Sequence, residues 1–178
     1  MSLQTSDLRY PIGEFSPPGT VRQDQVDDWI DDIAALPGEL RRTVSTLRDD
    51  QLDTPYRPDG WTVRQVVHHL PDSHMNSLIR FKWALTEDRP TIKAYDEKGW
   101  AVLPDSREPI AGSLDLLDAL HGRWVSLLRG LSQAQLRREF VHPESGPATL
   151  ALTVGSYAWH GRHHLAHIER LIEREGWS

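Results

Sequence analysis

The sequence contains no cysteine, and this absence removes several classes of chemistry at once. Disulfides, a thiol nucleophile and any zinc site built on cysteine are excluded. A metal ion in this chain would therefore have to be held by histidine, aspartate or glutamate side chains. The lack of cysteine also fits a cytoplasmic protein, and the cytoplasm is the location that we expect.

Long apolar runs and an excess of positive charge are missing as well. The sequence has no run of 18 apolar residues, so we expect no membrane partner and no transmembrane helix. Residues 1–10 lack the basic and apolar regions of a signal peptide. The formal net charge is −6, from 20 Lys and Arg against 26 Asp and Glu, which argues against a nucleic-acid partner.

Length and periodicity indicate one all-α domain that spans residues 1–178, of which 1–21 form an extended lead-in rich in proline and glycine. Capping-box patterns at Thr62 and Ser132 mark two helix starts. Pro37 should kink or split the first helix, and residues 142–149 are typical of a loop. The long helices are expected over residues 23–47, 62–85, 113–130 and 149–175.

Four long helices and one long crossover are typical of a four-helix bundle. The crossover is the connection between the second and third helices, residues 86–112, which contains three prolines and no regular period. Long connections in compact domains are often functional. We therefore expect this segment to cover part of a binding pocket, with Tyr95 and Trp100 at the entrance.

The strongest chemical signal is the stretch "WHGRHHLAHI", residues 159–168, which holds four histidines. At about 100° per residue, His160 and His164 lie at or on the apolar face of the last helix. His163 and His167 are rotated toward its charged border, where we expect them at the rim or in solvent. Residues four apart share a helix face, so His160 and His164 can both reach one ion.

Two imidazoles do not complete such a site, because catalytic zinc-type centres usually have three protein ligands and one open position. The stretch "VVHHLPDSH", residues 66–74, offers a third. Spacing places His74 on the apolar face of its helix and His69 at the margin of that face. The spacing leaves these two residues open as the third ligand, with His68 behind them.

The stretches "GWTVRQVVHHLPDSHMNSLIRFKWALTE" and "YAWHGRHHLAHI" together resemble the DinB superfamily. Nearly the whole chain is similar to its YfiT branch, the bacillithiol S-transferases once described as metal-dependent hydrolases. The resemblance implies a four-helix bundle, a homodimer and one divalent ion, zinc or nickel. It implies that the ligands are the histidine directly before Leu70, which is His69, and the pair His160 and His164. His74 would then be partly buried or line the pocket.

An ion with three histidine ligands and an open position can activate a bound water or a small thiol. Beyond that water or thiolate, no catalytic group is assigned. The resemblance favours a bacillithiol-like thiol as co-substrate, transferred to a small electrophile. Asp72 could orient His69, and Arg80 could bind an anionic thiol. Metal-dependent hydrolysis and non-catalytic binding of a metal or stress metabolite are the alternatives.

Overall fold

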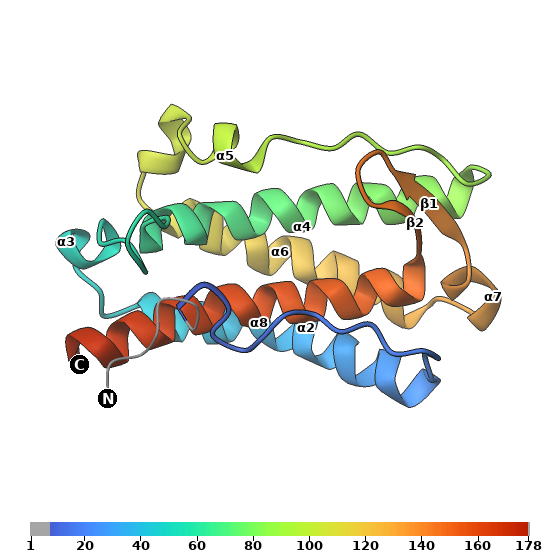
Figure 1. Ribbon diagram of the computed structural model, residues 1–178, viewed down its shortest axis with the longest axis horizontal. Coiled ribbons are helices and arrows are strands. Elements are labelled where there is room, and N and C mark those ends of the chain that lie inside the picture. The colour runs from blue at the N-terminus through green and yellow to red at the C-terminus, as the bar shows by residue number, and fades with distance from the viewer. Residues whose placement is uncertain (1–7, 178) are drawn as a thin grey trace.

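The computed structural model describes residues 8–177, and four long helices make up its body (Figure 1). Helix α2 packs against α6 and α8, and α4 packs against the same two helices, so the core lies between all four. The expected four-helix bundle is confirmed. No helix within residues 8–177 has both the length and the apolar character needed to cross a bilayer. The long helices are α2 (Gln23–Val44), α4 (Val63–Thr86), α6 (Ala111–Arg129) and α8 (Leu150–Glu175).

The ends of these helices follow from local side-chain chemistry. The Thr62 hydroxyl accepts the Gln65 N–H and the Gln65 side chain accepts the Thr62 N–H, which completes the predicted capping box of α4. Thr149 caps α8 by accepting the backbone N–H of Leu152. Helix α8 stops at Gly176, whose φ of 66° is in the left-handed region that glycine tolerates best. These predicted boundaries are confirmed.

Pro37 does not split α2, which runs unbroken from Gln23 to Val44, so the expectation of a split is wrong. Pro71 likewise lies inside α4 without ending it. A proline in a helix interior removes one backbone hydrogen bond and displaces the carbonyl four residues earlier. Both prolines are buried, and packing of the flanking turns against the other helices holds each helix together.

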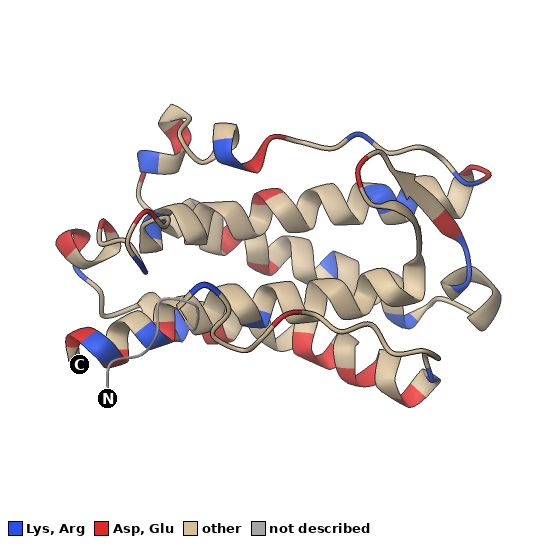
Figure 2. Cartoon of the chain, viewed as in Figure 1, with Lys and Arg blue, Asp and Glu red and all other residues tan. Residues whose placement is uncertain are grey.

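The apolar core is divided into two clusters by a layer of polar side chains. One cluster contains Leu78 of α4 and Ala158 of α8, and the other contains Leu70 of α4 and Leu165 of α8, so the boundary lies between these positions on each helix. Histidines occupy the interval on both helices. Figure 2 shows that Lys, Arg, Asp and Glu gather on the outer faces and connections of the bundle, with many of the acidic residues on the first half of α2. The polar layer is therefore built mainly from imidazoles.

The crossover between α4 and α6 lies along the outer side of α4 (Figure 1). It is not wholly irregular, because it contains α5 (Glu97–Trp100) and the short helix η1 (Pro104–Arg107). Helix η1 and α5 both contact α4. The remaining short helices are α3 (Asp49–Leu52) and α7 (Gln133–Leu136), of which α7 begins at the capping box of Ser132 predicted from the sequence.

The expectation of a loop over residues 142–149 holds only for residues 143–145, which form the turn of a hairpin, and is wrong for the strand residues on either side. Strand β1 (Glu139–His142) pairs antiparallel with β2 (Gly146–Thr149). The crossover also pairs with β1: the Ile92 N–H donates to the Val141 carbonyl, and the Val141 N–H donates to the Pro90 carbonyl. Strands of 4 residues are too short to show a clear period-2 alternation, and the pairing of β1 with the crossover joins segments that are distant in the sequence.

Candidate metal centre

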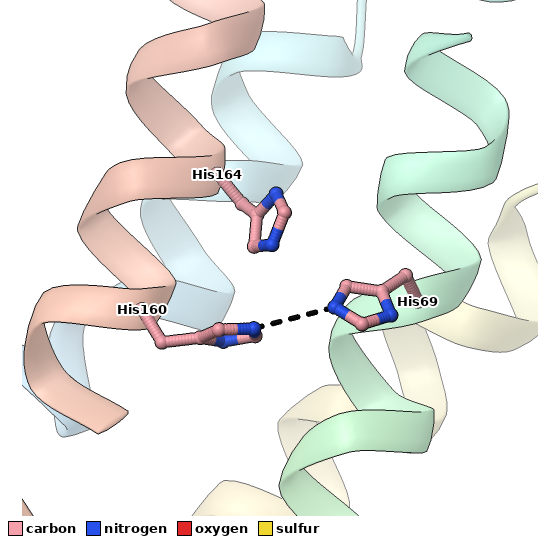
Figure 3. Close-up of side chains that lie close together, drawn as sticks. All are labelled: His69, His160 and His164. Carbon is pink, nitrogen blue, oxygen red and sulfur yellow. Dashed lines mark hydrogen bonds between the residues drawn. The ribbon is translucent and has the colours of Figure 1, made fainter. Parts of the chain in front are cut away.

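The polar layer brings together the three histidines that the sequence and the family resemblance indicated. His69 projects from α4, and His160 and His164 project from successive turns of α8 toward it (Figure 3). Each ring offers one nitrogen, and these three atoms all lie within 4.8 Å of one another. The Nε2 atoms of His69 and His160 are 3.2 Å apart. Within residues 8–177 no other group of three or more His, Asp or Glu has this spacing.

These donors fit a divalent ion in geometry and in charge state. Tetrahedral ligands at 2.0–2.1 Å from zinc lie about 3.3 Å apart, close to the spacing of His69 and His160. Burial lowers the pKa of His69 to about 4, and burial with neighbouring imidazoles lowers the pKa of His160 and of His164 well below the usual value. Neutral rings keep the lone pair that a metal requires. His164 Nδ1 is buried and has no hydrogen-bond partner among the described residues.

The three histidines lie in the wall of a pocket of about 880 Å³. Trp61 forms the adjacent wall, with its ring centroid 4.6 Å from that of His69. Three segments distant in sequence close the pocket: the lead-in, the turn before α4, and the crossover. Besides His69, His160, His164 and Trp61, the lining comprises Arg9, Tyr10, Tyr56, Arg57, Asp59, Gly60, Gln65, Ser73, Tyr95, Glu97, Lys98, Val102, His163 and His167.

The crossover covers part of this pocket, as expected, and Tyr95 lines it. Trp100 does not. It packs on Tyr95 at a centroid distance of 4.7 Å and lines a separate cavity of about 470 Å³. Arg80 also lines that second cavity, so its expected place in the histidine pocket is wrong. Arg80 and His69 share a stripe of α4, but 11 residues separate them by about 16 Å along the helix axis.

Asp72 does not contact His69, so the expectation that it orients this ring is wrong. No hydrogen bond joins the two side chains in the described part of the chain, and Asp72 is absent from the pocket lining. Burial, with a contribution from Asp105 on η1, raises the pKa of Asp72 to about 6. Residues three apart lie only about 60° apart around a helix, so spacing alone could not separate Asp72 from His69.

His163 and His167 are buried, at 7% and 3% exposure, so they are not solvated, but both line the histidine pocket, which agrees with the alternative of a place at its rim. The Tyr56 ring stacks on His167 at 4.0 Å and the Trp159 ring stacks on His163 at 4.5 Å. His167 Nε2 lies 3.1 Å from the Arg9 carbonyl oxygen. The lead-in and the turn before α4 fold over this face of α8, a tertiary contact that helical periodicity does not reveal.

His74 is fully buried, at 0% exposure, and lies behind the three-histidine cluster, so the expectation of a partly buried or pocket-lining residue is wrong. Its Nε2 lies 3.1 Å from His160 Nδ1, and its Nδ1 lies 2.8 Å from His121 Nε2. His121 does not stand out in the sequence, because a lone histidine on the apolar face of a helix resembles an ordinary core position. His68 has another role: its ring nitrogens bond to Ser113 and to the Glu108 carbonyl, which ties the end of the crossover to α4.

Comparisons with known proteins agree with this fold. A family model described as the DinB superfamily matches residues 32–168. A protein of Bacillus mycoides strain KBAB4 is 59% identical over 171 residues, which cover 96% of this chain and 99% of the relative. A protein of Bacillus cereus strain B4264 is 56% identical over 172 residues, covering 97% and 99%. Both relatives carry the name "Putative metal-dependent hydrolase".

The chain is also similar to the solved structure of YfiT from Bacillus subtilis. The TM-score is 0.94 at 52% sequence identity, and the match covers 97% of this chain and 99% of that chain. The YfiT structure is described as "a probable metal-dependent hydrolase with an unusual four-helix bundle topology".

Proposed function

Because the chain belongs to the DinB superfamily, we propose that it is a metal-dependent enzyme that transfers a low-molecular-weight thiol, of the bacillithiol type, to small electrophiles. His69, His160 and His164 would hold one divalent ion, zinc or nickel. The observation that carries the proposal is the convergence of three neutral imidazoles in the wall of an 880 Å³ pocket. The resemblance to bacillithiol S-transferases supports the choice of a thiol.

The ligand set suits the activation of an anionic nucleophile. When bound, the ion supplies a positive charge that lowers the pKa of a thiol beside it, so that the nucleophilic thiolate forms near neutral pH. Because the three imidazoles are neutral, they cancel none of that charge, as carboxylate or cysteine ligands would. The chain has no cysteine of its own, so the thiol must come from a co-substrate.

The surroundings favour a thiol over a water as the nucleophile. Metal-assisted hydrolysis generally uses an acid or base beside the ion. Besides the three ligands, His163 and His167 also line the pocket, and burial lowers the pKa of each to about 4, which makes both rings weak bases near neutral pH. The two carboxylates that line the pocket, Asp59 and Glu97, are exposed to solvent. A thiol does not depend on such a base, since the ion itself stabilises the thiolate.

The charge of the pocket supports an anionic thiol. Arg9, Arg57 and Lys98 line it against Asp59 and Glu97, which leaves an excess of one positive charge. The whole chain has a net charge of −6, so the charge of the pocket lining is opposite in sign to that of the protein as a whole. A thiol that bears carboxylates would be attracted by the cations of the wall.

A comparison of thiols tests the proposal. Zinc- or nickel-loaded protein is incubated with bacillithiol, glutathione, cysteine or mycothiol and the reporter electrophile monochlorobimane. We expect conjugation above background with bacillithiol, and loss of this activity on metal removal and in His160→Ala. The control His68→Ala, which removes a buried histidine outside the cluster, should keep the activity.

The names of the relatives support metal-dependent hydrolysis as the second candidate function. If no thiol reacts but the loaded protein hydrolyses ester or amide substrates, the hydrolase is correct and the transferase is wrong. If neither reaction occurs with a fully loaded site, the transferase is wrong and non-catalytic binding of a metal or metabolite gains support.

A further inference from the structure

A row of hydrogen-bonded histidines leads from the three-histidine cluster into the core. His160 Nδ1 lies 3.1 Å from His74 Nε2, and His74 Nδ1 lies 2.8 Å from His121 Nε2. His121 Nδ1 lies 2.6 Å from the carbonyl oxygen of Ile33. His74 and His121 are 0% and 2% exposed. This row, which we call the histidine chain, joins all four long helices in the order α8, α4, α6 and α2.

The last member of the histidine chain fixes the position of every proton in it. A carbonyl oxygen can only accept a hydrogen bond, so the Nδ1 atom of His121 must donate. A neutral imidazole has a single N–H, so His121 Nε2 accepts a bond from His74 Nδ1–H. His74 Nε2 must in turn accept from His160 Nδ1–H. His160 Nε2 is left without a proton and can only accept, and it faces His69 Nε2 at 3.2 Å (Figure 3).

Pro37 explains why the Ile33 carbonyl is available for this bond. In an α-helix the carbonyl of residue 33 accepts the N–H of residue 37. Residue 37 of α2 is proline, which has no N–H. The Ile33 carbonyl therefore has no helical partner, although Ile33 is only 1% exposed. A buried carbonyl without a partner is destabilising, and the His121 N–H satisfies it.

We propose that His74 and His121 are positioning residues that hold His160 in its Nδ1–H tautomer, with Pro37 freeing the terminal acceptor. The consequence for metal binding rests on the proposed function, whereas the tautomer itself does not. A histidine ligand that donates its other N–H is a more basic and better oriented ligand, and loss of such a partner typically lowers metal affinity about 10–100-fold.

Two other roles for the histidine chain make different predictions. If His74 and His121 only filled the core, replacing them would change stability but not the tautomer of His160. A path for protons to solvent would need an end that exchanges protons. The histidine chain ends on a backbone carbonyl buried in α2, which has no proton to exchange.

The tautomers can be read directly in metal-free protein by long-range proton–nitrogen NMR with ¹⁵N-labelled histidine. We expect His160, His74 and His121 each to show a single Nδ1–H form. A His160 ring that is protonated at Nε2, or that populates both forms equally, would overturn the proposal. Because no metal is present, this readout holds even if the proposed function fails. A protein that shows these tautomers but binds no zinc would refute the function alone.

A pair of substitutions at His121 separates positioning from packing. His121→Phe keeps a ring but offers His74 no acceptor, so the His160 tautomers should mix and the zinc affinity should fall about 10–100-fold. His121→Gln restores an acceptor oxygen and should recover most of that loss. His68→Gln, a change at a buried histidine of α4 outside the histidine chain, should leave zinc affinity unchanged. Affinities are measured by competition with a chromophoric chelator, on variants shown by thermal unfolding to be folded.

Wild-type zinc affinity in a folded His121→Phe variant would show that His121 only packs the core. If His121→Phe does not fold, the zinc affinity of His121→Gln and the tautomers of the wild type still distinguish positioning from packing. Pro37→Ala tests the end of the histidine chain, because it adds an N–H that competes for the Ile33 carbonyl. We expect it to raise the free energy of unfolding while the His121 tautomers mix and zinc affinity falls. An unchanged His121 tautomer in that variant would refute the part given to Pro37.

Discussion

Replacing any one of His69, His160 and His164 by alanine is expected to remove most of the bound zinc or nickel and leave the bundle folded. The wild type should hold about one ion per chain, as expected for three ligands converging on one point. Each variant keeps only two imidazoles, too few for a catalytic zinc-type centre. Elemental analysis after dialysis gives the metal content, and circular dichroism reports whether the helices persist.

His68→Ala is the matched control, since His68 is buried next to His69 but bonds to Ser113 and the Glu108 carbonyl instead. His163→Ala and His167→Ala should also retain the ion. His74→Ala should bind more weakly but reach the same stoichiometry at high metal concentration. If His74→Ala lost the ion while His69→Ala kept it, the ligand set proposed here would be wrong.

Metal-free protein is expected to lose much of its stability between pH 6.5 and pH 4. The pKa values of His69 and His121, at 7% and 2% exposure, are lowered from 6.5 to about 4, chiefly by burial. Unfolding exposes these rings, so in this range the unfolded chain binds protons that the folded chain does not. The stabilisation is complete above pH 6.5 and declines as the pH falls toward 4. One such pKa shift contributes about 3 kcal/mol to the free energy of unfolding.

That effect is large against a typical unfolding free energy of about 5–15 kcal/mol. The pKa values of six more histidines are lowered mainly by burial in the same direction: His74, His142, His160, His163, His164 and His167. Asp72 has the opposite effect on stability. Because its pKa is raised to about 6, the folded chain binds this proton at a higher pH than the unfolded chain does. Urea unfolding of metal-free protein at pH 7.5 and 5 measures the combined effect of these groups on the free energy of unfolding. Equal stability at the two pH values would contradict the neutral, buried state of these rings.

The helix ends and the inward pair of α8 could be predicted from sequence because each depends on local chemistry. Thr62 and Thr149 are preferred N-cap residues, and Gly176 suits the left-handed end of a helix. The spacing of His160 and His164 places both on one face whatever the helix packs against. These features need no knowledge of the neighbouring helices.

The choice between His69 and His74 could not be made from helical rotation, because both rings point into the bundle. Five residues separate them by about 7.5 Å along α4, so one ring reaches the cluster and the other lies behind it. Arg80 was misplaced for the same reason. The burial of His163 and His167 depends on segments that fold over them from elsewhere in the chain. The family resemblance, rather than periodicity, indicated His69.

X-ray absorption at the metal edge, recorded on zinc- or nickel-loaded protein with and without bacillithiol, tests the central claim most directly. Without the thiol, we expect three imidazole nitrogens at about 2.0–2.1 Å and one further light atom. With saturating thiol, that atom should be replaced by sulfur at about 2.3 Å. A spectrum that fits fewer than three imidazoles, or one that saturating thiol leaves unchanged, would contradict a three-histidine site that activates a thiol.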